Sequence, residues 1–158
     1  MGELTHFDAA GASRMVDVAA KPVTQRVSTA SGSVQMLPET LALIRAGKNA
    51  KGDVLEVARL AAIMAAKQTS GLIPLCHQVP LDAVEVTFEF PDDQHVAITA
   101  TARATARTGV EMEALVAVSV AGLTIYDMCK AVDRAMVVER VQLEAKSGGR
   151  SGHFRREP

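Results

Sequence analysis

Alternating apolar and polar positions predict four strands. Residues 22–36 form an extended stretch in which the apolar side changes: Val23 and Val27 fall on one parity, and Ala30, Val34 and Met36 on the other. This change predicts a bulge or a break near Ser28. Residues 84–90 and 96–105 alternate cleanly around a Pro-Asp-Asp turn, which predicts a hairpin with one solvated face. A last strand is expected over residues 137–146.

Helix signals occupy the gaps between these strands. Pro38 and Gly47 mark the start and the end of a short helix. Asp53 predicts the N-cap of a second helix that runs to about Lys67, and a long helix is expected over roughly residues 111–133. The order strand, helices, hairpin, helix, strand predicts an α+β fold. We expect the ferredoxin-like, split βαβ plan, with one antiparallel sheet and the helices packed on one face.

The long predicted helix has no charged residue between Glu113 and Asp127. A helix that is apolar all round is buried all round, and one small sheet cannot cover every side of it. We therefore expect a subunit interface over its outer face, with a core helix inside one chain as the alternative. Its two acids lie about 21 Å apart along the axis, at 1.5 Å per residue. If both take part in chemistry, a second subunit must bridge the gap, or the ligand must be long.

Composition narrows the class of protein. The 158 residues suit one domain, and we expect a flexible arm over residues 1–20, a folded domain over 21–147 and a Gly/Arg-rich tail over 148–158. A net charge of −1 argues against a general nucleic-acid binder. Cys76 and Cys129 form no CxxC pair, and no signal peptide or membrane-spanning stretch is visible. These features predict a cytoplasmic protein.

Several reactive side chains lie in loops or near helix ends. Lys51 lies on a turn ahead of a helix N-terminus, where an anion can bind, although a solvated turn fits equally well. Cys76 and His77 are adjacent, so they make a poor nucleophile–base pair, and His77 alone is more often structural. Lys146 opens a Gly-rich tail that can form an anion nest or a solvated end.

The ends of the long helix also carry charges. Asp127 and Lys130 share a face, and this spacing is more often an ordinary helix ion pair than a catalytic pair. Glu111 and Glu113 lie in the first turn, where the helix dipole alone favours negative charge. Spacing by itself does not decide whether these charged residues take part in chemistry or only stabilise the helix.

Four longer motifs occur in order along the chain: SGLIPLCH over residues 70–77, GVEMEAL over 109–115, LTIYDMCKAV over 123–132 and KSGG over 146–149. Together they resemble the molybdenum cofactor biosynthesis protein C family, the cyclic pyranopterin monophosphate synthases. The resemblance covers nearly the whole chain. It implies that the substrate is 3′,8-cyclo-7,8-dihydroguanosine 5′-triphosphate, and that the products are cyclic pyranopterin monophosphate and pyrophosphate. It also implies a ferredoxin-like catalytic domain and a homohexamer, a trimer of dimers, with the active site at the dimer interface.

Matched position by position, the resemblance implies catalytic roles for Asp127, Lys51 and Lys130. It further implies that a second set of residues contacts the substrate or lines the site: Leu75, Cys76, His77, Glu111, Met112, Glu113 and Lys146. We expect His77, Lys146 and Arg26 to neutralise phosphate charge as the leaving group departs. We expect no cofactor and no protein metal site, with Mg²⁺ allowed on the substrate's triphosphate. Gln78 and Arg150 depart from the family pattern, which favours Pro and Lys there.

Two other classes of protein fit the predicted fold. A non-catalytic nucleotide sensor would use the same anion-binding loops and leave its ligand unchanged. An RNA-binding module would stack bases on aromatic strand residues, but the second hairpin strand has none. Fold alone does not choose among these, because this architecture hosts many functions.

Overall fold

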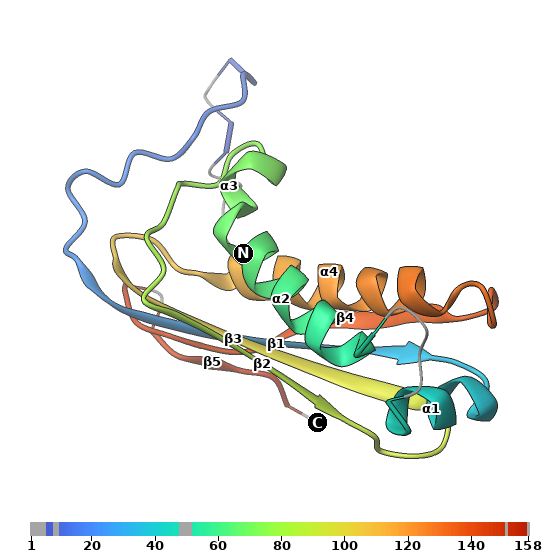
Figure 1. Cartoon of the computed structure of the whole chain (residues 1–158). Helices are drawn as coiled ribbons and strands as arrows, with labels where there is room; N and C mark the ends of the chain where they lie inside the picture. The colour runs from blue at the N-terminus through green and yellow to red at the C-terminus, as the bar shows by residue number, and fades with distance from the viewer. Residues whose placement is uncertain (1–5, 8–9, 48–51, 151, 158) are drawn as a thin grey trace.

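A computed structural model describes residues 6–7, 10–47, 52–150 and 152–157. Its five strands form one antiparallel sheet in the order β2-β3-β1-β4-β5 (Figure 1). The strands are β1 (Thr24–Gln35), β2 (Ala83–Glu89), β3 (His95–Ala106), β4 (Val137–Ser147) and β5 (Phe154–Arg155). Because β3 pairs antiparallel with both β1 and β2, those two strands run parallel with β3 between them, as in a split βαβ unit. The predicted α+β class is confirmed, and the strand order is consistent with the ferredoxin-like plan.

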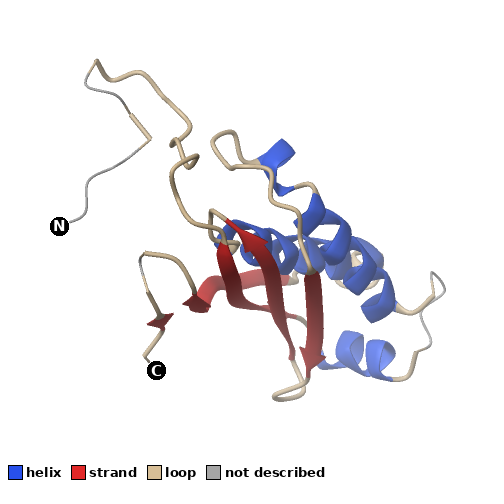
Figure 2. Cartoon of the chain, turned by 90° about the vertical axis from the view of Figure 1, so that its left-hand side faces the viewer, coloured by secondary structure: helices blue, strands red, loops and turns tan. Residues whose placement is uncertain are grey.

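The helices are α1 (Pro38–Arg45), α2 (Val54–Lys67), α3 (Thr69–Leu72) and α4 (Glu111–Cys129). The predicted start signals are confirmed: Pro38 is the first residue of α1, and the Asp53 side chain accepts from the backbone amides of Leu55 and Glu56 at 3.0 and 3.2 Å. Helices α2 and α4 cover one face of the sheet, and α1 lies at its end (Figures 1 and 2).

Helix α4 is the centre of the core. It packs on β1, β3, β4 and α2, and its small residues allow close approach. A Cβ added at Gly122 would lie 2.8 Å from Val138 Cγ1, so glycine is required where the helix meets β4. By length and composition α4 would also suffice to cross a membrane, but half of its apolar stretch is buried inside the protein, as in a core helix.

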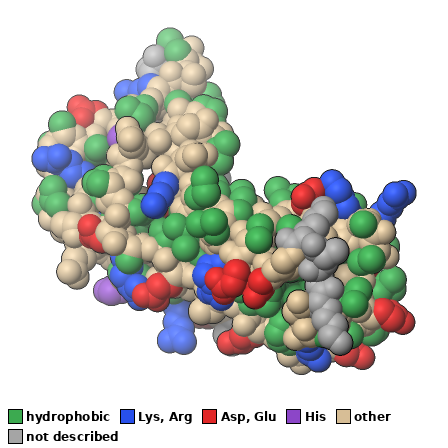
Figure 3. Space-filling view, viewed as in Figure 1, with side chains coloured by type: hydrophobic (Ala, Val, Ile, Leu, Met, Phe, Trp, Pro, Cys, Tyr) green, Lys and Arg blue, Asp and Glu red, His purple; other side chains and the backbone are tan. Residues whose placement is uncertain are grey.

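One protomer does not cover all apolar residues of these helices. From the sequence only the sheet was expected to cover α4, but α2 covers a second side of this helix. Leu123 of α4 is still 59% exposed, and Leu60 and Met64 of α2 are 60% and 51% exposed. Hydrophobic side chains gather over α2 in Figure 3. These side chains are the candidates for the predicted subunit interface.

Strand β1 corrects one prediction. Its register with β3 is unbroken from Thr24 to Gln35, so β1 has no break near Ser28. The pairing with β4 does shift between Thr29 and Ala30, but the extra residue belongs to β4. The apolar parity was misread because polar Arg26 and Ser28 occupy the buried side of β1.

The two ends of the chain differ. Residues 10–20 of the arm contain no helix or strand and extend away from the sheet (Figure 2). The tail turns back, since β5 pairs with β4 and the Arg156 amide donates to the Glu144 carbonyl at 2.8 Å. The tail is therefore not a solvated free end.

Candidate active site

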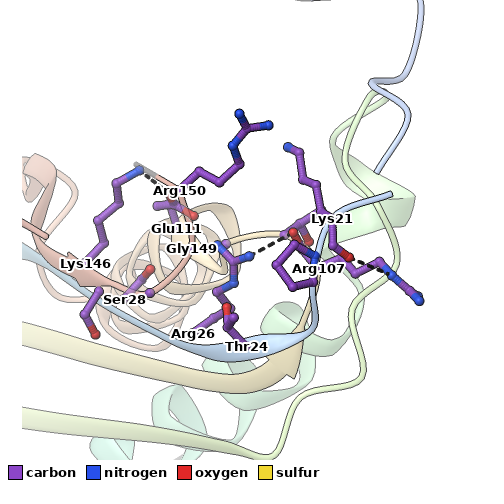
Figure 4. A pocket seen from close by; sticks show the side chains of 14 residues that line it. Lys21, Thr24, Arg26, Ser28, Arg107, Glu111, Lys146, Gly149 and Arg150 are labelled. Atoms are coloured by element: carbon purple, nitrogen blue, oxygen red, sulfur yellow. Dashed lines mark hydrogen bonds and ion pairs between the residues drawn. The ribbon is translucent and has the colours of Figure 1, made fainter. Parts of the chain in front are cut away.

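A cavity of about 510 Å³ opens where β1 begins and where β3 and β4 end, beside the first turn of α4 (Figure 4). Its walls come from three separate stretches of the chain, within residues 21–28, 107–111 and 146–150. Strand pairing assembles it, because the register sets Ser28 of β1 opposite Lys146 of β4. Both side chains then face the start of α4 on the helix side of the sheet.

The cavity is strongly cationic. Of the described residues that line it, five carry positive charge (Lys21, Arg26, Arg107, Lys146 and Arg150), and Glu111 alone is an acid. Clefts lined by one sign of charge attract ligands of the other sign. The charge distribution therefore suits an anion with several negative charges.

Arg26 lies at the back of this cavity and is only 7% exposed. Its Nε donates to the Ala106 carbonyl at 3.2 Å, and its Nη2 donates to the Arg107 carbonyl at 3.0 Å. These neutral acceptors fix the side chain without cancelling its charge, and no ion pair to Arg26 exists in the described part of the chain. A buried charge without a counter-charge is costly, so Arg26 is prepared for an anionic ligand.

Glu111 and Lys146 join α4 to β4 across the cavity. The Lys146 Nζ lies 2.8 Å from Glu111 Oε1, and the two side chains are 25% and 27% exposed. A Cβ at Gly109 would overlap the Glu111 carboxylate, so glycine there allows Glu111 to fold back toward Lys146.

Glu113 is buried next to this cavity, with 4% of its surface exposed. Burial raises the pKa of the Glu113 carboxyl, and the negative charge of Glu111 raises it further. A hydrogen bond from the backbone of Glu113 itself acts in the opposite direction and offsets part of this rise. Burial also raises the pKa of the Cys76 thiol, and the negative charges of Glu113 and Glu111 raise it further. Cys76 is therefore close to the start of α4, and its raised pKa favours the thiol over the nucleophilic thiolate.

His77 makes a contact with the N-terminal arm. Its Nε2 donates to the Val16 carbonyl at 2.8 Å, with the ring tautomer inferred from that bond. Leu75, Cys76 and His77 are all half-buried, as is Met112 on α4. The loop of residues 75–77 thus connects the arm to the region of α4 that carries Glu111 and Glu113.

Asp127 and Lys130 form an ion pair at the other end of α4. The Lys130 Nζ lies 2.6 Å from Asp127 Oδ1, and both side chains are more than half exposed. The hydrogen bond from Lys130 to Asp127, and then the charge of Asp127, raise the pKa of the lysine. Sixteen residues separate Asp127 from Glu111, which is about 24 Å of helix at 1.5 Å per residue.

Comparison with known proteins identifies the family. Residues 15–149 match the MoaC family. The chain belongs to the MoaC family. It is 64% identical over 159 residues to the cyclic pyranopterin monophosphate synthase of Magnetococcus marinus, which covers 99% of this chain and 97% of that protein. It is 60% identical over 158 residues to the enzyme of that name from Thermomicrobium roseum, covering 99% and 95%. Cyclic pyranopterin monophosphate synthase 3 of Mycobacterium tuberculosis is 59% identical over 155 residues, covering 98% and 88%. The resemblance read from the sequence motifs is confirmed.

In this MoaC protein the predicted site residues separate into two groups. Arg26, Glu111 and Lys146 line the cavity, and Glu113 and Cys76 lie beside it. Asp127 and Lys130 lie at the far end of α4, so one protomer does not bring them to the cavity. Lys51 lies outside the described residues.

Arg150 was noted in the sequence only as a departure from the family pattern, and two further cations of the cavity were not singled out: Lys21 and Arg107. They belong to separate segments, and no local pattern connects them. One signal was available, since Arg26 and Ser28 interrupt the apolar parity of a strand and were read as a break. Among the described residues no group of three His, Cys, Asp or Glu side chains is arranged to hold a metal ion.

Proposed function

We propose that this protein is a cyclic pyranopterin monophosphate synthase. It converts 3′,8-cyclo-7,8-dihydroguanosine 5′-triphosphate to cyclic pyranopterin monophosphate and pyrophosphate in molybdenum cofactor biosynthesis. Membership of the MoaC family and the names of its relatives support the activity. The observation that carries the proposal is the cationic cavity around Arg26, which has the charge that a triphosphate requires.

The cavity binds the phosphate chain of the substrate. An internal sugar hydroxyl displaces pyrophosphate, so negative charge grows on the leaving group during the reaction. Preorganised cations stabilise such charge without reorganising at the moment of reaction. Arg26 and Lys146 are held by their hydrogen bonds before the ligand arrives. We infer that His77 is a third group that contacts the phosphates.

The proton transfers fall to the acids and lysines around the reacting rings. Glu113 accepts from N–H donors on the guanine-like edge, next to Leu75, Cys76 and Met112. Asp127 raises the pKa of the Lys130 ammonium and keeps it protonated in the free protein. Lys130 and Asp127 trade protons with the substrate once desolvation by the bound ligand lowers the pKa of the lysine. Lys51 acts as a further general acid or clamps a phosphate.

The active site is shared between two subunits. Asp127 and Lys130 lie about 24 Å of helix from Glu111, so a partner subunit supplies them to the cavity. The exposed apolar side chains Leu60, Met64 and Leu123 support a helix-mediated contact between copies. The full assembly is a homohexamer built as a trimer of dimers.

We also propose that the enzyme works in the cytoplasm and uses no resident cofactor. Mg²⁺ enters only on the triphosphate of the substrate.

A turnover assay tests the activity. The cyclised substrate is supplied and pyrophosphate release is measured for the wild type, Lys51→Ala and Asp127→Asn. We expect the wild type to release pyrophosphate and both variants to lose most of that rate. An inactive wild type would reject the function and favour a nucleotide sensor, and a fully active Asp127→Asn would reject the catalytic role of that residue.

Subunit complementation tests the shared site. Arg26→Ala and Asp127→Asn are each expected to be inactive, because each damages every site of its own assembly. Co-expressed, they form mixed assemblies in which some cavities have both groups intact, and activity returns. No recovery in mixed assemblies, or a species of 16.7 kDa on sizing at working concentration, would contradict sharing.

A further inference from the structure

Two glycines close the cavity directly over Arg26. Gly148 and Gly149 follow Lys146 and have φ of 95° and 76°, in the left-handed region that favours glycine. Their surroundings impose a second requirement. A Cβ at Gly148 would overlap the Gln25 carbonyl oxygen, and a Cβ at Gly149 would overlap Nη1 of the Arg26 guanidinium.

Within this turn, the lack of space for a Cβ is found at Gly148 and Gly149 but not at Gly152. Gly152 is in the same turn, since its amide donates to the Gly149 carbonyl at 3.2 Å, and its φ is 67°. A Cβ at Gly152 would meet nothing within 4 Å. Backbone conformation therefore accounts for Gly152, whereas Gly149 is also needed for the space that Arg26 occupies.

Arg26 is thus held from two sides. On one side Nε and Nη2 donate to the carbonyls of Ala106 and Arg107, and on the other Nη1 lies against Gly149 (Figure 4). A side chain fixed in this way loses little rotamer freedom when a ligand binds, which strengthens binding. The planar guanidinium also keeps a defined direction toward the cavity.

We propose that Gly149 is a positioning residue that sets the affinity of the cavity for the substrate's phosphate chain. Its missing side chain lets the Gly148–Gly149 turn close on Arg26 and hold the guanidinium in its binding orientation. The identity of the ligand as a phosphate chain rests on the proposed function. The role of Gly149 itself rests on its contact with Arg26.

Inorganic pyrophosphate tests this role without turnover. Its Kd is measured by titration calorimetry for the full-length wild type, Gly149→Ala and Gly152→Ala, and thermal unfolding is followed for each. We expect Gly149→Ala to weaken binding about tenfold, the effect of losing one hydrogen bond to a charged group. Gly152→Ala imposes similar backbone strain in the same turn, and we expect it to bind like the wild type. Equal affinities for the two variants, or no pyrophosphate binding by the wild type, would overturn the proposal.

Arg26→Lys provides a test that does not depend on how Gly149→Ala folds. Lysine keeps the charge but lacks the fork that contacts both carbonyls. We expect pyrophosphate to bind this variant about tenfold more weakly. A lysine variant that binds as well as the wild type would show that a positioned guanidinium is not needed, and would reject the proposal.

The double variant separates positioning from general damage to the turn. In the Arg26→Lys background, Gly149→Ala should cause no further loss, because no guanidinium remains to be displaced. An undiminished loss in that background would contradict the proposal. In turnover, Gly149→Ala should raise KM for the substrate more than it lowers kcat. A wild type that binds pyrophosphate but releases none from substrate would reject the proposed function and leave this comparison intact.

Discussion

Glu111 is the acid in an otherwise cationic cavity, and replacing it gives a counterintuitive prediction. Its carboxylate holds the Lys146 ammonium at 2.8 Å, so it competes with a phosphate for that cation. Glu111→Gln keeps the shape of the side chain and removes its charge. We therefore expect the variant to bind inorganic pyrophosphate more tightly than the wild type does.

The size of the effect follows from the geometry. A phosphate oxygen at hydrogen-bond distance from Lys146 would lie about 6 Å from the Glu111 carboxylate. Two unit charges at about 6 Å repel by roughly 2.8 kcal/mol at an effective dielectric constant of about 20. If the adjacent ammonium and the exposed quarter of both side chains screen about half of this, roughly 1.4 kcal/mol remains, or about tenfold in Kd.

Titration calorimetry with pyrophosphate measures the change, and Glu113→Gln is the matched control. It removes the same charge two residues along α4, but Glu113 does not line the cavity. We expect about a twofold change or less for the control, since its charge acts from farther away. Unchanged or weaker binding by Glu111→Gln, or equal tightening by both variants, would refute the reasoning. Because Glu111 matches an active-site position, its variant should also turn over more slowly while binding better.

Three further predictions concern stability. Burial raises the pKa of Glu113 in the folded protein above its value in the unfolded chain. The free energy of unfolding therefore falls as the pH rises from the unfolded-state pKa to the folded-state pKa. Glu113→Gln should remove this dependence and raise the unfolding free energy near neutral pH by about 1 kcal/mol; parallel pH profiles of the melting temperature would contradict it. A Cβ at Gly32 would lie 2.7 Å from Val118 Cγ1, so Gly32→Ala should cost about 1–3 kcal/mol in denaturant unfolding. Gly71→Ala, in open space, serves as its control, and equal midpoints would refute the packing argument. The buried Asp133 carboxylate accepts the Leu37 amide at 2.9 Å at the start of α1, so Asp133→Ala should lower the unfolding free energy by about 1–3 kcal/mol; an unchanged chemical-denaturation midpoint would argue against this capping role.

The end of α4 shows how tertiary contacts override local pattern. Apolar periodicity continues past Cys129, and the sequence predicted a helix to about residue 133. The helix ends at Cys129, and Asp133 instead accepts the amide of Leu37 and the amide of Ala135. Because Leu37 is almost a hundred residues earlier in the chain, no local window contains this competing partner.

The candidate site was predicted unevenly for a similar reason. Family motifs identified Glu111, Glu113 and Lys146, because each lies in a continuous run of recognisable residues. Lys21 and Arg107 lie in no such run, and only the cavity shows them near Arg26. The separation of Asp127 from Glu111 was predictable, since the rise of a helix depends on residue number alone.

The sequence by itself determined where the regular elements form. Helix caps, prolines and alternating side chains act within a few residues, so Pro38, Asp53 and the hairpin turn were sufficient to place their elements. The tertiary structure decided which side chains meet. The pairing of β1 with β3 and β4 brings Arg26 to the Ala106 carbonyl and Lys146 to Glu111, across about eighty and thirty-five residues. Such contacts depend on the register of distant strands, and that register is set by the packed core as a whole.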